Sequence, residues 1–180
     1  QLLTMTSRPF EDKEPWFPCT EGDWVQLVDG TLGKVIHLTP EFVQLVMLGG
    51  GRKTYPTSGF VTQHAVNLSG GFRLSSTFGV DYRHQAIALT EIPAALEASV
   101  LEGLLRAIDK EHVRNVQVAF ARAGESALEY EIIVDFAGAV AERSRLLQRL
   151  LQRQALAACQ QHGWTVPFPQ LVVHGAPISA

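Results

Sequence analysis

Cysteine is scarce in this sequence. Its two cysteines, Cys19 and Cys159, lie far apart and outside any CxxC or Cys/His pattern. Two isolated thiols fit a reducing compartment better than a disulfide framework. We expect both to be small fillers of the core or incidental surface thiols.

Long apolar runs are missing as well, although 46% of the residues are hydrophobic. No stretch approaches the roughly 20 apolar residues that a transmembrane helix needs. The first residues also lack the basic, apolar and small-residue order of a secretory signal. Because the chain begins with Gln1 rather than Met, we expect it to be a piece of a longer protein.

No part of the chain has an excess of positive charge. The formal net charge is −3, from 18 acidic and 15 basic residues that are spread over both halves. Nucleic-acid binding usually needs a concentrated basic face, which this pattern does not supply. The expected strand at 116–122 also lacks the aromatic pair with which RNA-recognition motifs stack bases. We therefore expect no nucleic-acid partner.

Motifs of catalysis are absent too. The chain holds neither a Gly-x-Ser-x-Gly elbow nor a His-Glu-x-x-His motif. The segment Gly51-Arg52-Lys53-Thr54 has the wrong spacing for a phosphate-binding loop and is better explained as a hairpin tip. The carboxylates of Glu129, Glu131 and Asp135 share a strand face, which we interpret as solvated rather than catalytic. We therefore expect no enzyme, no catalytic residue and no cofactor.

Metal binding is not expected either. The sequence has six histidines, and none of them has a second histidine four residues away. A pair of ligands on one helical turn is therefore missing. We expect surface or half-buried side chains at His37, His64, His84, His112, His162 and His174.

Residues 22–68 alternate between short strands and turns. We expect strands at 24–28, 32–38, 42–48 and 52–55. Asp29-Gly30 predicts a hairpin turn, and Gly33 indicates a bulge or a close approach of two backbones. Pro56 lacks a backbone donor, so the chain should leave the sheet or run along an edge there. The spacing predicts a small, strongly bent β barrel of the SH3 or Sm-like kind, without a helix.

From residue 69 onwards the periodicity alternates between that of strands and that of helices. The expected elements are a strand at 72–82, a helix at 91–108, strands at 116–120 and 128–136, a helix at 140–162 and a strand at 171–173. This β-α-β-β-α-β order is the ferredoxin-like arrangement. Right-handed crossovers place both helices on one face of a four-stranded antiparallel sheet. The fold class is therefore α+β.

Each expected helix has its own boundary signals and apolar stripe. Thr90 is placed as the N-cap of the first helix, and Gly163 as the C-terminal cap of the second. One helical face of the first is marked by Ile92, Leu96, Val100, Leu101, Leu104, Leu105 and Ile108. The stripe of the second consists of Leu146, Leu147, Leu150 and Leu151.

Several short segments stand out over this layout. They are Arg8-Pro9-Phe10, Gly22-Asp23-Trp24-Val25, the hairpin glycines Gly30 and Gly33, Tyr55-Pro56-Thr57-Ser58, Val66-Asn67-Leu68-Ser69, Val80-Asp81-Tyr82 and Val166-Pro167-Phe168-Pro169-Gln170. In this order and spacing they resemble the soluble half of the small-conductance mechanosensitive channel (MscS) family. Each motif is short, but their common order from Arg8 to about His174 makes the resemblance specific.

The chain departs from the family pattern at three places. Thr57 stands where the family usually has Asn, which puts in doubt any subunit contact made through that side chain. The segment from Glu11 to Glu21 is longer than the family's short link after the pore helix. Little sequence remains after Gly175, so the extra C-terminal strand of some members is expected to be short or missing.

The resemblance implies a subunit of a tension-gated channel, divided into three parts. Residues 1–21 would be the tail of the pore helix with its junction and insert, residues 22–68 the Sm-like β domain, and residues 69–180 the ferredoxin-like domain. Seven such subunits would form a hollow cage on the cytoplasmic side of the inner or plasma membrane. The partners implied are other copies of the chain and, through transmembrane helices absent from it, the lipid bilayer. The alternative is a soluble regulatory or interaction module that binds a protein or a small ligand.

An aromatic pair, Trp16 and Phe17, follows the junction. If the resemblance holds, these rings would lie near the membrane surface, where aromatic side chains favour the interface. Packing on the β domain as a local cover is the alternative.

Overall fold

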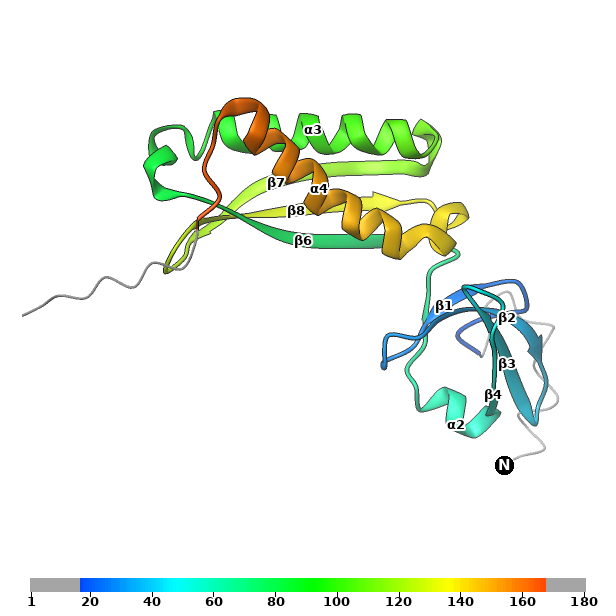
Figure 1. Cartoon of the computed structure of the whole chain (residues 1–180). Helices are drawn as coiled ribbons and strands as arrows, with labels where there is room; N and C mark the ends of the chain where they lie inside the picture. Colours follow the sequence, from blue (N-terminus) through cyan, green and yellow to red (C-terminus); the bar gives the residue numbers. More distant parts are fainter. Residues whose placement is uncertain (1–16, 168–180) are drawn as a thin grey trace, which may run out of the picture. The chain divides into compact units, whose positions relative to one another are not determined.

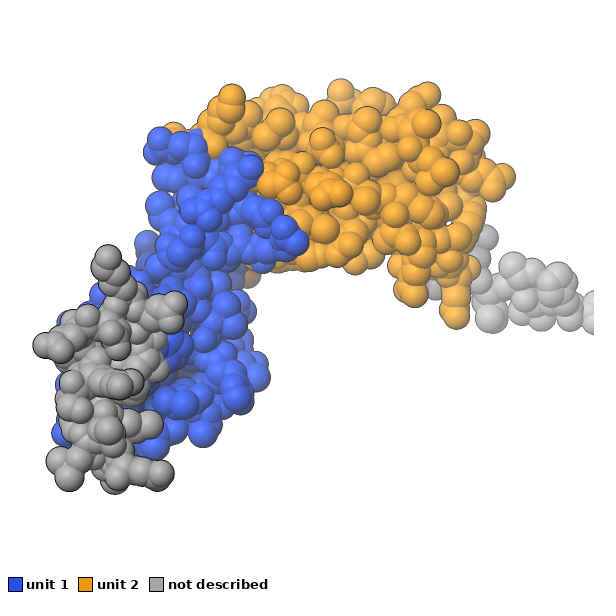
Figure 2. Space-filling view, turned by 180° about the vertical axis from the view of Figure 1, so that it is seen from behind, with its two compact units in different colours: residues 1–73, 111–114, 135–145 blue, residues 74–110, 115–134, 146–180 orange. Residues whose placement is uncertain are grey.

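The computed structural model describes residues 17–167 (Figure 1). The chain divides into two compact units, which are coloured separately in Figure 2. The first comprises residues 1–73, 111–114 and 135–145, and the second comprises residues 74–110, 115–134 and 146–180. Within the described residues, no helix is both long enough and apolar enough to span a membrane.

The first unit is built on a five-stranded sheet with the order β4-β3-β2-β1-β5. The strands are β1 (Trp24–Gln26), β2 (Leu32–Leu38), β3 (Phe42–Met47), β4 (Arg52–Pro56) and β5 (Val66–Asn67). Every pair of neighbours is antiparallel, as the short hairpin turns of the sequence predict. The register shifts in β2 between Val35 and His37, where the strand bends. The expected barrel-type β domain is confirmed.

The core of this sheet is filled by side chains from alternate strand positions. Phe17 and Phe60 stack there with their ring centroids 5.7 Å apart. The other members of this buried cluster are Cys19, Val25, Leu27, Val35, Val43 and Leu45. Because alternate residues of a strand point to one face, the sequence pattern specifies which of them are buried.

One expectation for the β domain is wrong. A short helix, α2 (Thr57–Val61), follows β4, where the sequence predicts none. Pro56 ends β4 and takes the position just before the helix, with φ −54° and ψ 139°. The helix carries the side chain of Phe60 into the core, where it is fully buried. A single turn with one apolar anchor shows no helical periodicity, so the pattern could not reveal it.

The second half of the chain supplies a sheet and two long helices. The elements are β6 (Phe72–Val80), the 3₁₀ helix η1 (Tyr82–Ile87), α3 (Glu91–Ala107), η2 (Lys110–His112), β7 (Val113–Ala123), β8 (Leu128–Phe136), η3 (Gly138–Arg143) and α4 (Ser144–His162). The strand order is β6-β8-β7, and α3 and α4 cover the same face of the sheet (Figure 1). This matches the ferredoxin-like order through α4, and the last expected strand lies outside the described residues.

Between the helices and the sheet lies a continuous apolar layer. Side chains of all three strands and both helices are buried there, among them Val80, Ile92, Leu96, Val100, Leu104, Tyr130, Ile132, Val134, Leu147 and Leu151. The hydroxyl of Tyr130 donates a hydrogen bond to the carbonyl of Ala88 at 2.9 Å, so this buried polar group is satisfied.

Three leucines assigned to the apolar stripes lie on the surface instead. Leu101, Leu105 and Leu146 are 40%, 42% and 49% exposed. Each is the neighbour of a buried residue on the same helix. Successive helical residues are turned by about 100°, so only one member of an adjacent apolar pair can face the sheet. The second helix also begins as α-helix at Ser144 rather than near 140, because residues 138–143 form the 3₁₀ turn η3.

Candidate functional site

The hydrogen bonds around Asp23 and Asn67 bring together two of the sequence motifs, one at each end of the β domain. The amide Nδ2 of Asn67 donates to Oδ2 of Asp23 at 2.8 Å and to the carbonyl of Pro18 at 3.3 Å. The backbone N–H and the hydroxyl of Thr20 also donate to Oδ2 of Asp23. One carboxylate oxygen therefore holds both the segment that leads into β1 and the strand that leaves the domain.

Ser69 adds a second connection between the same two segments. Its hydroxyl accepts a hydrogen bond from the backbone N–H of Trp24 at 2.8 Å, and its own N–H donates to Oδ1 of Asn67 at 2.9 Å. The backbone of Leu68 donates to the carbonyl of Trp24 at 2.8 Å. The side-chain oxygen and nitrogen of Asn67 and the hydroxyl oxygen of Ser69 are thus all used to close the β domain.

Below these hydrogen bonds lies a small apolar cluster. Leu32, Leu68 and Ala141 are buried in it, and the half-buried Trp24 and Phe72 pack against it. Ala141 belongs to η3, so this cluster joins segments that are far apart in the sequence but belong to the first unit. We name this set of hydrogen bonds and apolar contacts the β-domain junction.

Three motif glycines of the β domain have definite backbone roles. Gly22 and Gly30 take φ values of +96° and +81°, a region that favours glycine. Gly33 lies where two neighbouring strands approach closely, because a Cβ there would lie 3.1 Å from Cβ of Leu45.

Pro56 and Thr57 lie at the edge of the β domain. Pro56 pairs with Phe42 in β4, which is an edge strand, so its missing donor costs the sheet nothing. The hydroxyl of Thr57 donates to the carbonyl of Thr39 at 2.9 Å. Thr57 therefore anchors the turn before β3 within its own chain.

The C-terminal motif is described only at its beginning. Backbone N–H of Asp81, at the end of β6, donates to the carbonyl of Thr165 at 3.0 Å. Backbone N–H of Thr165 in turn donates to Nε2 of His84 at 3.0 Å. Pro167 is the last described residue, and Phe168, Pro169 and Gln170 lie outside the described part.

The N-terminal motif residues divide in the same way. Arg8, Pro9, Phe10 and Trp16 lie outside the described residues. Phe17 is described and is 3% exposed in the core of the β domain. Phe17 therefore packs on the β domain, which is the alternative to membrane contact given above. Its ring is not available to a membrane surface.

The carboxylates of β8 all have partners on neighbouring strands. Glu129 forms an ion pair with Arg122 at 2.7 Å, and this hydrogen bond raises the pKa of the Arg122 guanidinium. Asp135 accepts two hydrogen bonds from Arg73, at 2.7 and 2.9 Å. Glu131 accepts a hydrogen bond from the hydroxyl of Ser75 at 2.8 Å. Charges matched in this way belong to a solvated sheet face rather than to a site that needs a free acid or base.

Both cysteines are buried, each with 1% exposure. Burial, with a smaller contribution from the charge of Asp23, raises the pKa of Cys19 to about 12. Burial raises the pKa of Cys159 to about 11. Because the thiolate is the reactive form, neither residue can act as a nucleophile near neutral pH.

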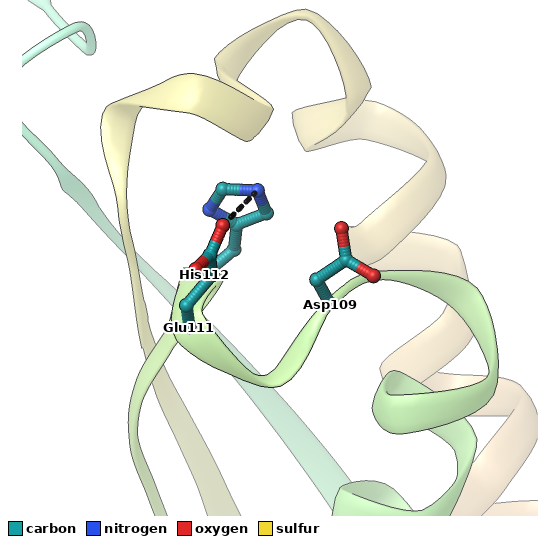
Figure 3. Close-up of side chains that lie close together, drawn as sticks. All are labelled: Asp109, Glu111 and His112. Carbon is teal, nitrogen blue, oxygen red and sulfur yellow. Dashed lines mark ion pairs between the residues drawn. The ribbon is translucent and has the colours of Figure 1, made fainter.

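Figure 3 shows Asp109, Glu111 and His112 close together on the turn after α3. One possible ligand atom from each lies within 4.8 Å of the others. The carboxylate of Glu111 is 3.8 Å from Nε2 of His112, and the two acidic residues are exposed. Exposed acidic groups are common without a metal ion, and we describe this group as a solvated turn.

The sequence identified several members of the β-domain junction but not how they are connected. Asp23, Trp24 and Asn67 belong to the recognised motifs, whereas Thr20 and Ala141 carry no signal of their own. Ala141 joins the junction because η3 packs in the first unit, and no local sequence pattern predicts such a tertiary contact.

Comparison with known proteins identifies the fold. No family model matches the chain, and no curated protein sequence does either. Among solved structures, MscS of Helicobacter pylori in its closed state superposes on 89% of the chain with a TM-score of 0.61 and 15% identity. MSL1 of Arabidopsis thaliana superposes on 94% of the chain with a TM-score of 0.57 and 19% identity.

These similarities cover only part of the other proteins. The chain spans 60% of the H. pylori MscS chain and 57% of the A. thaliana MSL1 chain, less than two thirds of each. At this level of identity the similarity establishes the fold, in agreement with the motif order of the sequence. The chain therefore has the fold that makes up more than half of each of these MscS-type mechanosensitive channel subunits.

Proposed function

We propose that this chain is the soluble, vestibule-forming part of an MscS-type channel subunit. In this proposal the complete protein opens under membrane tension and releases ions and small solutes when the external medium is diluted. The observation that carries the proposal is the fold shared with MscS and MSL1 over 89% and 94% of the chain. It agrees with motifs that the sequence alone presents in the same order.

The β-domain junction supports this function because it ties the two ends of the β domain together. A soluble domain attached to a pore must transmit and withstand force along its backbone. The junction holds the first and last strands of the β domain, β1 and β5, side by side as antiparallel neighbours. Asp23 and Asn67 reinforce that pairing with a side-chain hydrogen bond of 2.8 Å. A force applied where the chain enters the β domain, at β1, is therefore also borne by β5, where the chain leaves it.

The proposal also includes where the protein acts and what it binds. The complete subunit would lie in the inner or plasma membrane, with this part on the cytoplasmic side. Other copies of the chain would surround a common axis, seven in number if the assembly follows the family. No catalytic residue is assigned, because the carboxylates of β8 are paired and both thiols are buried.

Patch-clamp recording of the complete gene product tests the function directly. The full gene that encodes this chain is expressed in a bacterium without mechanosensitive channels, and membrane patches are stretched by suction. Stepwise currents that need tension, and that patches from cells with empty vector lack, are the expected result. Silent patches from membranes that contain the protein would contradict the proposal and favour the soluble interaction module.

A further inference from the structure

The outward side of α3 carries an exposed apolar stripe in addition to the face buried on the sheet. Its members are spaced by four, three and four residues, and each is exposed: Ala94, Ala98, Leu101 and Leu105. This spacing is that of a helix–helix contact seam. The exposed Glu91 and Glu102 lie on the same helix, where Glu102 is paired with Arg106. The 17 residues of this helix hold three acidic side chains and one basic side chain.

The outward side of α4 has members spaced by three, four and three residues, with the opposite charge. Its exposed members are Leu146, Arg149, Arg153 and Leu156, and the two leucines are 49% and 45% exposed. The 19 residues of this helix include no aspartate or glutamate. Within the described residues, neither Arg149 nor Arg153 has a salt-bridge partner. The chain therefore displays an acidic-apolar helix face and a basic-apolar one.

The two faces point away from each other. The hydroxyl of Ser99 donates to the carbonyl of Gln154 at 2.9 Å. This hydrogen bond marks the side of each helix that faces the other helix. At about 100° per residue, Ala98 and Leu101 on α3 are turned about 100° and 160° from that side. Arg153 and Leu156 on α4 are turned from it by the same angles, about 100° and 160°. The two faces therefore cannot cover each other within one chain.

We propose that the acidic-apolar face of α3 in one copy packs against the basic-apolar face of α4 in the next copy. Different surfaces on opposite flanks of one helix layer form a head-to-tail contact, which closes into a ring when the rotation per copy allows it. The leucines supply the apolar centre of the contact, while glutamates and arginines select the partner and orientation. This inference rests on the proposed function, since it assigns the contact by which ring-forming subunits recognise each other.

Charge reversal gives a test that does not depend on the stability of one variant. One variant carries Glu91→Arg and Glu102→Arg, and a second carries Arg149→Glu and Arg153→Glu. Each alone would place like charges across the contact, and we expect its self-association to weaken at least about tenfold in analytical ultracentrifugation. An equimolar mixture should recover the association of the natural chain, because each variant then offers the other complementary faces.

Matched controls reverse two other exposed charges, on the β domain, Glu41→Arg and Arg52→Glu, and should leave association unchanged. Higher salt should weaken the natural contact, because exposed charges are screened. The proposal is overturned if the natural chain remains monomeric up to about 1 mM. It is equally overturned if the reversed variants associate normally, or if mixing them restores nothing.

The result separates this inference from the proposed function. Tension-activated currents from the complete protein, together with reversed variants that assemble normally, would leave the function standing and remove the α3–α4 contact. Complementation by mixing, together with silent patches, would establish the contact in a protein that is not a channel.

Discussion

The backbone N–H of Thr165 donates a hydrogen bond to Nε2 of His84 across 3.0 Å. The carbonyl of Thr165 accepts from the backbone N–H of Asp81 at 3.0 Å. Two hydrogen bonds thus hold the segment after α4 to the end of β6, and one of them uses the ring of a histidine as its acceptor.

The first prediction concerns the contribution of the His84 ring to this contact. His84→Ala removes the acceptor of the Thr165 amide and leaves that N–H without a partner in a partly buried site. We expect protection of the Thr165 amide against hydrogen exchange to fall roughly tenfold in this variant, the value of one hydrogen bond.

The matched variants are His84→Gln and His37→Ala. Glutamine at position 84 offers an oxygen acceptor and should retain most of the protection of Thr165. The side chain of His37 is 61% exposed, and its replacement should leave this protection unchanged. Full protection of the Thr165 amide in His84→Ala would show that His84 does not control this contact.

A second prediction concerns the hydrogen bond between Asp23 and Asn67. Removal of either side chain leaves its partner's polar atoms in a partly buried site without a hydrogen bond, which costs about 1–3 kcal/mol. Asp23→Ala and Asn67→Ala should each lower the free energy of unfolding by this amount, measured by urea denaturation. Because the two groups touch, the double variant should show a coupling energy of about 0.5–3 kcal/mol.

Gln44→Ala is the control for this pair. Its Nε2 bonds to the hydroxyl of Thr54 at 3.1 Å on the exposed edge of the same sheet. Loss of an exposed contact should change stability by less than about 0.5 kcal/mol. Additive effects of the two junction variants would contradict a direct contribution of the Asp23–Asn67 bond.

The strands and helices could be predicted because their signals are local and repeated. Alternation along Leu128–Phe136 specifies the buried face of β8 without knowledge of its neighbours. The same holds for the glycine turns at Gly30 and Gly163, where the backbone takes a positive φ. The order of the two folds also follows from this periodicity, and superposition on MscS confirms it.

The sequence-based predictions were wrong where tertiary contacts determine which residues are buried or helical. Leu104 and Leu105 are equally apolar, yet the first is fully buried and the second is 42% exposed. Their sequence context alone cannot rank them, since the sheet and α4 determine which side of α3 is covered. Likewise, α2 is stabilised by the packing of Phe60 in the core, and the five residues of the helix alone do not reveal that contact.

A third prediction tests how closely η3 approaches the end of the β domain. A Cβ at Gly138 would overlap the backbone carbonyl of Ser69, and a backbone atom cannot move aside as a flexible side chain can. We expect Gly138→Ala to lower the free energy of unfolding by about 1–3 kcal/mol, the usual cost of overpacking. Denaturation followed by tryptophan fluorescence measures it, because Trp24 packs against the cluster that holds Ala141.

Gly70→Ala is the matched control for this substitution. Its Cβ would meet nothing within 4 Å, and like Gly138 it has no positive φ. Alanine at such a position should be neutral or stabilise the protein by up to about 1 kcal/mol, through the unfolded state. Equal effects of the two substitutions would show that Gly138 does not need to be small.

The last prediction concerns the two buried thiols. Their folded pKa values, about 12 for Cys19 and about 11 for Cys159, lie above the ordinary value of 9.0. A group whose pKa rises on folding stabilises the protein fully below its unfolded pKa and loses that contribution as the pH passes its folded value. The stabilisation should therefore be complete below about pH 9 and decline as the pH rises through 11 to 12. Melting temperatures of the natural chain and of a Cys19→Ala, Cys159→Ala variant should accordingly converge with rising pH.

In the folded chain at pH 8, a thiol reagent should react with the two cysteines far more slowly than in urea, because the thiolate forms only when the protein opens. Rapid labelling of the folded protein would instead show that one of these thiols is open to solvent.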